Sequence, residues 1–399
     1  MKKRGYKKPN WFMYGIFSLC TKLYSKFFLN LKILKNELKG YKGSCVIIAN
    51  HECVIDFMTL GATLPKTNFV ISSSFYNTLP IQGIMRMAGV LPKQQFQTSS
   101  NDLKKMKEVV DHNMPLAIYP AGIMSEQGLS TPIPESTGKF LKWLKQDVYV
   151  AKVKGTYLTK PKWSSKWRKG KTFIEIYKFL SKDEIANLSN EELFNLINKE
   201  LIFDSYKNQE ELMIKYKNGN NIEGLESVLY KCPKCGKEFS IINKDNTLIC
   251  TNCGNSATSD IYGFLNKVKE DDIIYKHPSD WAMEIEKQLY DEIINNDDFN
   301  LFDECEIYLL NDKKHKYEYA GNGTISLTKK LLTLIGNVNN EELNKEFLAH
   351  QYITLPFVPN KHFEIQDGSV SYRIKLKNHI QTTKWVWSLK NLYKIENSK

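Results

Sequence analysis

The sequence predicts an α/β domain, followed by a small cysteine module and a mainly-β domain closed by a terminal helix. Three observations lead to this prediction. Short runs rich in Val, Ile and Tyr alternate with amphipathic stretches from about residue 40 to residue 180, which is typical of layered α/β proteins. Two C-x-x-C pairs follow near residue 240. Beyond residue 305, strand-like runs succeed one another without intervening helical spacing.

The α/β domain is built from five expected strands and three expected helices. Runs of β-branched and aromatic residues predict strands at 44–50, 68–74, 115–122, 147–158 and 172–180. Helical spacing of apolar residues predicts helices at 80–88, 101–112 and 134–146. Residues 181–230 are polar with a helical pattern, and Ser181 and Ser189 are typical N-cap residues there.

The last third of the chain changes from helical to strand-like patterns. Residues 271–295 indicate an acidic helix, and strand-like runs fill 305–378. The pairs Asn322-Gly323 and Asp367-Gly368 are turn signals that should separate strands.

Residues 382–395 predict a terminal helix, on which Trp385, Leu389 and Leu392 share a face. The two tryptophans, Trp385 and Trp387, are better explained as core residues than as ligand-stacking residues. A small barrel or sandwich closed by one helix resembles a pleckstrin-homology-type domain, although no motif supports that likeness.

These patterns divide the chain into four parts. We expect a basic amphipathic segment at 1–40, the α/β domain at 41–225, the cysteine module at 228–265 and the mainly-β domain at 280–399.

The cysteine module carries the strongest motif. Cys232 and Cys235 form one C-x-x-C-G pair and Cys250 and Cys253 the other. Each pair can form a knuckle, and four thiolates suit a tetrahedral Zn²⁺. Four protein ligands leave no open position, so the zinc would be structural. Redox-active dithiols are the alternative, but no thioredoxin-like pattern surrounds the pairs. The module resembles a rubredoxin-like zinc ribbon.

The other four cysteines are scattered singly along the chain, as Cys20, Cys45, Cys53 and Cys305. This usage indicates a reducing compartment and excludes a disulfide framework.

The charge is unevenly distributed. The formal net charge is +12, yet residues 1–180 carry 29 Lys/Arg against 10 Asp/Glu, while residues 181–399 carry 27 against 34. A basic first half suggests an acidic partner, which could be a nucleic acid, an anionic membrane or a phosphorylated substrate.

The N-terminal segment combines aromatic and basic residues. Its most apolar run, 11–20, is about half the length of a spanning helix, and no secretory signal is evident. Lysines and Arg4 flank it, and each Lys near an anionic surface contributes on the order of 1 kcal/mol. We expect the segment to lie in the membrane interface, so the protein would be peripheral at the cytoplasmic face. Packing of the aromatics on the main domain is the alternative.

A histidine and an aspartate follow the first expected strand. His51 lies in the turn after 44–50, and Asp56 opens the next helix. In that arrangement the carboxylate can fix the imidazole tautomer, which leaves the other ring nitrogen as a general base. The alternative is that His51 caps the helix and Asp56 complements its dipole.

A second block favours catalysis. After "NHECVID" at 50–56, the chain has "GVLPKQQ" at 89–95, "YPAGIMS" at 119–125 and an apolar strand at 147–158. In order and spacing, residues 10–180 resemble the glycerolipid acyltransferase family of the lysophosphatidic acid acyltransferase type, whose first block is N-H-x4-D and whose third is F-P-E-G-T-R-S. The third block keeps Pro120, Gly122 and Ser125, and it replaces Phe by Tyr119, Glu by Ala121, Thr by Ile123 and Arg by Met124.

The resemblance implies acyl transfer from acyl-CoA or acyl-carrier protein to a hydroxyl of a lysophospholipid or related glycerolipid, with His51 as base and Asp56 as its orienting acid. It makes Tyr119, Pro120, Gly122 and Ser125 candidate substrate-binding residues. Because the family's Glu and Arg help to hold the acceptor phosphate, another cation must replace them. The candidates are Lys93, Arg86, Lys139 and the basic run 152–171, which is otherwise a solvated or membrane-facing surface.

Two rival functions are considered. A zinc-ribbon nucleic-acid binder should have basic and aromatic patches near the ribbon, whereas the basic residues lie far from it in sequence, so a nucleic-acid partner is not expected. A degenerate acyltransferase fold that binds lipid or acts as a scaffold is motivated by Ala121 and Met124.

Overall fold

The computed structural model describes residues 6–94, 99–217, 221–311, 313–368 and 370–398. The predicted basic residues Lys2, Lys3 and Arg4, and Gln95 of the second block, lie outside these ranges. The chain forms two compact units, one of Met1–Pro161 with Trp167–Lys217 and the other of Lys162–Lys166 with Asn218–Lys399.

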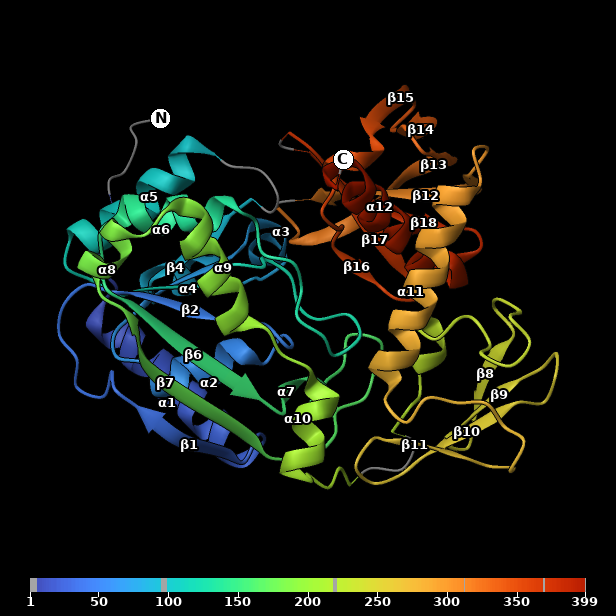
Figure 1. Ribbon diagram of the computed structural model, residues 1–399. Coiled ribbons are helices and arrows are strands. Elements are labelled where there is room, and N and C mark those ends of the chain that lie inside the picture. The colour runs from blue at the N-terminus through green and yellow to red at the C-terminus, as the bar shows by residue number, and fades with distance from the viewer. Residues whose placement is uncertain (1–5, 95–98, 218–220, 312, 369, 399) are drawn as a thin grey trace. The chain divides into compact units, whose positions relative to one another are not determined.

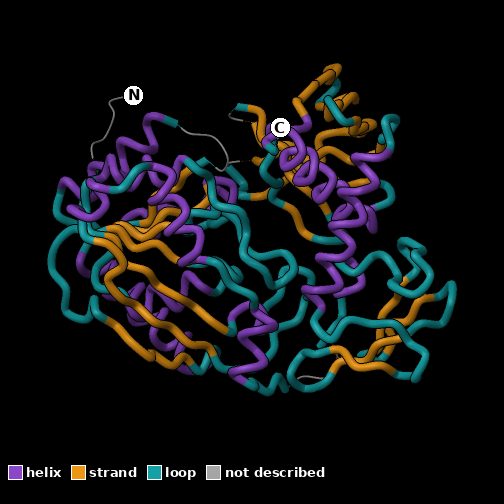
Figure 2. The backbone as a smooth tube through the Cα atoms, viewed as in Figure 1, coloured by secondary structure: helices purple, strands orange, loops and turns teal. Residues whose placement is uncertain are grey.

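The first unit is built on a seven-stranded sheet in the order β1-β7-β6-β2-β5-β3-β4 (Figures 1 and 2). In chain order its strands are β1 (Leu31–Asn36), β2 (Val46–Ala49), β3 (Asn68–Ser72), β4 (Val90–Lys93), β5 (Leu116–Ile118), β6 (Val148–Lys154) and β7 (Thr172–Leu180). The five strands from β6 to β4 pair in parallel, whereas β7 runs antiparallel to β6. The α/β prediction is therefore confirmed.

Helices cover both faces of this sheet (Figure 1). They are α1 (Trp11–Phe27), α2 (Asp56–Thr63), α3 (Ser73–Asn77), α4 (Gln82–Met87), α5 (Ser100–Asp111), α6 (Ser136–Leu144), α7 (Thr156–Thr159), α8 (Lys182–Asn187), α9 (Asn190–Leu201) and α10 (Ser205–Leu212). The fully buried strand β2 shows why two cores form. Val46 and Ile48 pack with α5, α6, α8 and α9, while Ile47 and Ala49 pack on the opposite face with α1 and α2, because strand side chains alternate.

Several local expectations in this unit need correction. The segment 1–40 was expected to be interfacial throughout, but Leu31–Asn36 forms β1, which pairs in parallel with β7. Its alternation of Leu, Ile and Lys suits a half-exposed strand as well as an amphipathic helix, and pairing with a distant strand decides between them. Three expected strands also end early: 68–74 ends at Ser72 before α3, 115–122 ends at Ile118, and 147–158 ends at Lys154 before α7.

The second unit combines two antiparallel sheets with two long helices (Figure 1). The cysteine module contains β8 (Ile241–Lys244), β9 (Thr247–Cys250), β10 (Ser256–Ser259) and β11 (Leu265–Lys267), after the 3-10 turn η1 (Leu225–Ser227). Helix α11 (Pro278–Asn295) begins at Pro278, seven residues later than the sequence suggested, because proline is favoured in the first helical turn.

The larger sheet of this unit has seven strands in the order β15-β14-β13-β12-β18-β17-β16. They are β12 (Asn300–Asn311), β13 (Lys316–Thr328), β14 (Leu331–Val338), β15 (Glu341–Leu348), β16 (Phe357–Val358), β17 (His362–Asp367) and β18 (Val370–Leu376), followed by α12 (Thr382–Asn397); short 3-10 turns η2 (Ala349–Gln351) and η3 (His379–Gln381) lie between them. A mainly-β region with a final helix is thus confirmed, while its likeness to a pleckstrin-homology domain stays a prediction.

The turn expected at Asn322-Gly323 is wrong, because both residues lie inside β13. Gly323 instead allows two strands to pack closely. A Cβ on Gly323 would collide with the Ile335 carbonyl oxygen of the neighbouring strand, so glycine permits a close approach of two backbones. The turn predicted at Asp367-Gly368 is confirmed, since β17 ends at Asp367 and Gly368 follows with φ 56°.

One hydrophobic core runs through the whole second unit. Cys232 and Cys250 of the cysteine module belong to the same buried cluster as Trp281 of α11 and Trp385 and Trp387 of α12. Both C-terminal tryptophans are completely buried, which confirms that they are core residues.

Candidate active site and metal centre

The carboxyl end of β2 is fixed by the side chain of Asn50. Its Nδ2 donates to the Val153 carbonyl oxygen, and the Val153 N–H donates back to Oδ1, both at 2.8 Å. Asn50 is buried, so both hydrogen bonds are shielded from water. This two-way contact holds the end of β2 against β6 and defines where His51 leaves the sheet.

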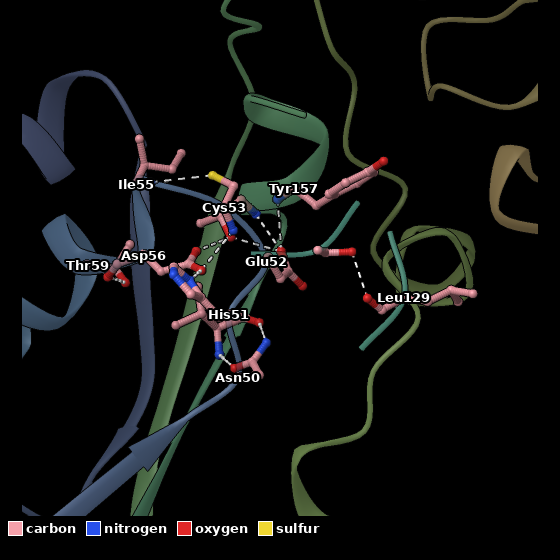
Figure 3. A network of polar contacts seen from close by, with 12 residues as sticks. Asn50, His51, Glu52, Cys53, Ile55, Asp56, Thr59, Leu129 and Tyr157 are labelled. Atoms are coloured by element: carbon pink, nitrogen blue, oxygen red, sulfur yellow. Dashed lines mark hydrogen bonds and ion pairs between the residues drawn. The ribbon is translucent and has the colours of Figure 1, made fainter. Parts of the chain in front are cut away.

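His51 and Asp56 lie in direct contact. His51 Nδ1 is 2.9 Å from Asp56 Oδ2, and the same carboxylate oxygen accepts from the Cys53 N–H at 2.9 Å (Figure 3). Residues five apart would not meet on a continuous helix, but α2 begins only at Asp56, so the turn 51–55 folds the ring back onto the carboxylate. The structure thus places the two residues as the sequence suggested.

The environment of the pair is asymmetric. Asp56 is fully buried, while the His51 side chain keeps 16% of its surface exposed. An ionised carboxylate only accepts hydrogen bonds, so Nδ1 carries the proton and Nε2 presents a lone pair. Within the ranges that the structure describes, Nε2 has no hydrogen-bond partner. An imidazole held in this way can accept a proton from a hydroxyl.

The third sequence block packs against the histidine. The Tyr119 ring stacks on the His51 ring at 4.1 Å between centroids and 20° between planes. Burial, with smaller contributions from Asp56 and Cys53, raises the pKa of the Tyr119 phenol well above its usual value. The buried hydroxyl of Tyr119 has no hydrogen-bond partner among the described residues.

The rest of this block is a loop tied to the His51 backbone. Gly122 has φ 71° and donates to the Tyr119 carbonyl at 2.9 Å, which closes the turn that contains Pro120. The Ser125 N–H donates to the His51 carbonyl at 3.0 Å. The Ser125 hydroxyl is occupied within the loop, donating to the Leu129 carbonyl at 2.7 Å and accepting from the Gly128 N–H at 2.9 Å. Ser125 therefore shapes the loop.

Glu52 was not singled out from the sequence, yet it lies at the centre of this network (Figure 3). Its Oε2 accepts from the N–H groups of Thr156 and Tyr157, both at 2.9 Å, and lies 2.9 Å from the Thr156 hydroxyl. Burial and the Asp56 carboxylate raise the pKa of Glu52 to about 7, although its hydrogen bonds oppose the shift. The available signal was a carboxylate directly after a buried strand and beside His51.

The candidate phosphate-binding cations lie in different places. Lys93 ends β4, and its ammonium group donates to the Gln94 carbonyl at 2.9 Å. Burial lowers the pKa of Lys93 despite the opposing effect of Asp102. Arg86 on α4 and Lys139 on α6 are exposed, and neither side chain contacts the His51 network within the residues described.

The basic run 152–171 does not form one surface. Lys152 pairs with Glu200 at 2.6 Å, and Arg168 is only 4% exposed. Lys162 and Lys166 belong to the second unit. These residues therefore form neither a single pocket nor a single solvated face.

Helix α1 exposes its apolar side. Tyr14, Thr21 and Ser25 are its buried residues. The exposed stripe consists of large apolar residues at helical spacing, namely Trp11, Phe12, Ile16, Leu19, Leu23 and Phe27. No described helix is long and apolar enough to cross a membrane. A hollow of about 420 Å³ beside α1 is lined by residues that include Trp11, Leu19 and Leu64, and by none of the His51 network.

The four module cysteines converge on one point. Their sulfur atoms all lie within 4.8 Å of one another. Cys232 Sγ is 3.7 Å from Cys253 Sγ, and Cys235 Sγ is 3.8 Å from Cys250 Sγ. Four sulfurs at about 2.3 Å from a tetrahedral Zn²⁺ would be about 3.8 Å apart. The sulfur positions therefore fit a metal ion, and they are too far apart for disulfide bonds.

Residues 30–157 match the family model named Acyltransferase. Among solved structures, the chain is similar to the 1-acyl-sn-glycerophosphate (LPA) acyltransferase PlsC from Thermotoga maritima, with 15% identity over 51% of this chain and 81% of that one and a TM-score of 0.43. It is also similar to the Ran binding domain of the nuclear complex component Nup2 from Ashbya gossypii, with 13% identity over 25% of this chain and 97% of that one and a TM-score of 0.20. The family match thus supports an acyltransferase domain within the first unit.

Proposed function

We propose that the first unit transfers a fatty acyl group from a thioester, acyl-CoA or acyl-carrier protein, to a hydroxyl of a lysophospholipid or related glycerolipid. The observation that carries this proposal is the 2.9 Å contact between His51 Nδ1 and Asp56 Oδ2, which leaves Nε2 as a proton acceptor. It lies within the segment that matches the Acyltransferase family.

The reaction needs one base that can return its proton. His51 Nε2 removes the proton of the acceptor hydroxyl as the oxygen attacks the thioester carbonyl carbon. The tetrahedral intermediate collapses and its C–S bond breaks. The departing thiolate takes the proton from the His51 imidazolium, and Asp56 stabilises that cation meanwhile. The balanced outcome is an ester and a free thiol, and the chemistry requires neither a metal nor a covalent enzyme intermediate.

Lys93 is the cation best placed for the acceptor phosphate. It lies at the carboxyl end of β4, and His51 follows the carboxyl end of β2. Parallel α/β sheets bind ligands at this edge. Strands β2, β5, β3 and β4 are neighbours, so three strand spacings, about 14 Å, separate β2 from β4. The hydroxyl and the phosphate of a glycerophosphate are only a few bonds apart, so the His51 and Lys93 side chains must extend toward each other for one acceptor to contact both. Lys139 is a weaker candidate, since it is exposed on α6.

The outward apolar stripe of α1 supports association with an anionic membrane surface. Trp11 and Phe27 are 79% and 70% exposed, and Lys22 and Lys26 lie on the same helix. Apolar residues beside lysines on an interfacial helix bind headgroup and acyl regions together. A peripheral position at the cytoplasmic face would bring the lipid acceptor to the enzyme.

The test of catalysis is acyl transfer from labelled acyl-CoA, and separately from acyl-carrier protein, to a panel of lysolipids. We expect His51→Ala to lower turnover by about 10²–10⁴-fold, while His379→Ala, an exposed histidine of the second unit, behaves as wild type. Equal turnover by His51→Ala and wild type would contradict the assignment. Lysolipid binding without turnover by the wild type would favour a lipid-binding scaffold, for which Ala121 and Met124 are the motivation.

The membrane proposal is tested by flotation with vesicles of neutral or anionic lipid. Leu19→Glu with Leu23→Glu should abolish binding to anionic vesicles. Leu196→Glu on α9, where the leucine is also exposed, should not. Binding that is unaffected by the α1 pair would refute this face as the membrane surface.

A further inference from the structure

Two buried carboxylates flank a single hydroxyl beside His51. Thr156 Oγ1 lies 2.9 Å from Glu52 Oε2 and 2.5 Å from Asp56 Oδ1. All three residues have no exposed surface. The acids come from the turn after β2 and the start of α2, while Thr156 opens α7 a hundred residues later.

If both carboxyl groups were ionised, the Thr156 hydroxyl would have to supply two protons for these two contacts. A hydroxyl has one proton and can donate to one of the two carboxylate oxygens. The other oxygen is still within hydrogen-bond distance of Oγ1, and an ionised carboxylate cannot donate. One of the two acids must therefore be protonated for both contacts to be favourable.

We infer that Glu52 is a positioning residue that shares one titratable proton with Asp56 through Thr156, and that this proton controls how strongly His51 binds its own. The part of this inference that concerns catalysis depends on the proposed function. The proton sharing itself does not.

Burial favours Glu52 as the place where the proton resides. Burial and Asp56 raise the pKa of Glu52 to about 7, which is the range in which a base for hydroxyl activation works. The titratable groups facing Glu52 are Asp56 on α2, Cys53 in the preceding turn and Tyr216 after α10. Arg168 faces Tyr216.

A purely structural role for Glu52 explains only part of the geometry. Its Oε2 anchors the first N–H groups of α7. That role does not account for the short contact between Thr156 and Asp56. It also leaves Glu52 Oε1 buried without a partner among the described residues. A carboxyl group that carries a proton is less costly to bury there than a carboxylate.

The protonation state of the acid pair changes the negative charge that faces the His51 imidazole. While the pair holds its proton, one negative charge faces the imidazole; once the proton leaves, two do. The second charge favours the imidazolium form of His51. Replacing Glu52 by Gln removes the second charge at every pH.

The decisive experiment uses no substrate. Infrared spectra of the full-length wild type should show the C=O stretch of a neutral carboxylic acid at mildly acidic pH, and this band should disappear as the pH rises through neutrality. Glu52→Gln should lack it, whereas Glu175→Gln, a glutamate of β7, should retain it. Thr156→Val should shift the band because its hydrogen bond is lost, and Thr156→Ser should restore the wild-type position.

Histidine NMR provides the second measurement. With the His51 ring signals assigned by their absence in His51→Ala, these signals should show less of the imidazolium form at neutral pH in Glu52→Gln than in wild type. Absence of the neutral-acid band in wild type, or equal His51 titration in wild type and Glu52→Gln, would overturn the inference. If Glu52→Gln does not fold, the shift of the band in Thr156→Val, which keeps both acids, still tests its assignment to this pair. Because no substrate is involved, failure of acyl transfer leaves these results standing, and transfer without them refutes Glu52 alone.

Discussion

Asn50 and Val153 exchange two hydrogen bonds of 2.8 Å across the β2–β6 pair. The contact joins residues about a hundred positions apart, and it holds the residue that directly precedes His51. The position of His51 therefore depends on a residue outside the proposed proton-transfer pair.

Asn50→Ala tests that dependence. The change leaves the buried N–H and carbonyl of Val153 unpaired, so we expect a loss of roughly 2 kcal/mol in the free energy of unfolding and a fall in acyl transfer of about 10–100-fold. Urea denaturation and steady-state rates measure the two effects. Asn187→Ala, at an exposed position on α8, is the control. Normal stability together with normal turnover would rule out the positioning role.

Asp56→Asn tests the orientation of the imidazole. The amide keeps the shape but loses the charge that stabilises the imidazolium; its oxygen can still accept from the Cys53 N–H and His51 Nδ1–H, while its NH₂ group faces the Thr156 hydroxyl. We expect turnover to fall by about 10²–10³-fold with little change in the folded structure. Rates measured against pH, with circular dichroism to verify folding, provide the check; an unaltered rate would contradict the assignment of Asp56.

Tyr119→Phe should stabilise the protein. The Tyr119 hydroxyl is buried and lacks a partner among the described residues, and an unsatisfied buried hydroxyl costs about 1–3 kcal/mol. Phenylalanine preserves the ring that stacks on His51. Thermal denaturation should therefore show a higher Tm, with acyl transfer retained. A lower Tm, or lost activity, would mean that the hydroxyl has a ligand.

Cys250→Ser should remove bound zinc. The wild type should contain one equivalent of zinc by elemental analysis, and the variant close to none, because a structural site needs all four thiolates. The second unit should also unfold at lower temperature, since metal binding contributes directly to folding. Cys20→Ser, at an exposed position on α1, should keep its zinc. Full zinc content in Cys250→Ser would refute the site.

Glu286 makes the second unit sensitive to acid. Burial alone would raise its pKa, but Lys390 and Lys394 outweigh burial and lower the pKa of Glu286 to about 2. Their ammonium groups lie 2.9 and 2.5 Å from its carboxylate oxygens. Because the folded pKa is lower than the unfolded one, this contribution is complete above about pH 4.5 and is lost as the pH falls toward 2.

Glu286→Gln should therefore lose on the order of 3 kcal/mol of stability at neutral pH, and the difference from wild type should shrink as the pH falls from 4.5 toward 2. Denaturant titrations at several pH values measure both quantities. Glu284→Gln, on the same helix, is the matched control. A difference that is independent of pH would contradict the ion-pair explanation.

Local sequence patterns were sufficient to predict much of the fold and part of the candidate site. The alternating strands and helices, the cysteine knuckles and the turn that joins His51 to Asp56 all follow from residues close together in sequence. The Glu52–Thr156 contact could not be predicted in that way, since it depends on β2 pairing with β6 a hundred residues later. Strand β1 and the glycines of β13 were misjudged for the same reason, because a distant partner strand determines their conformation.

The short segment Lys162–Lys166 belongs to the second unit although it lies within the sequence of the first. Its Trp163 is buried in the core of the second unit, and the Lys162 ammonium group lies over the Phe357 ring at 4.1 Å. During synthesis this tryptophan leaves the ribosome well before the residues that cover it. Cutting the chain at residue 217 would thus leave the first unit whole with Trp163 uncovered, while the second fragment would lack Trp163 from its core.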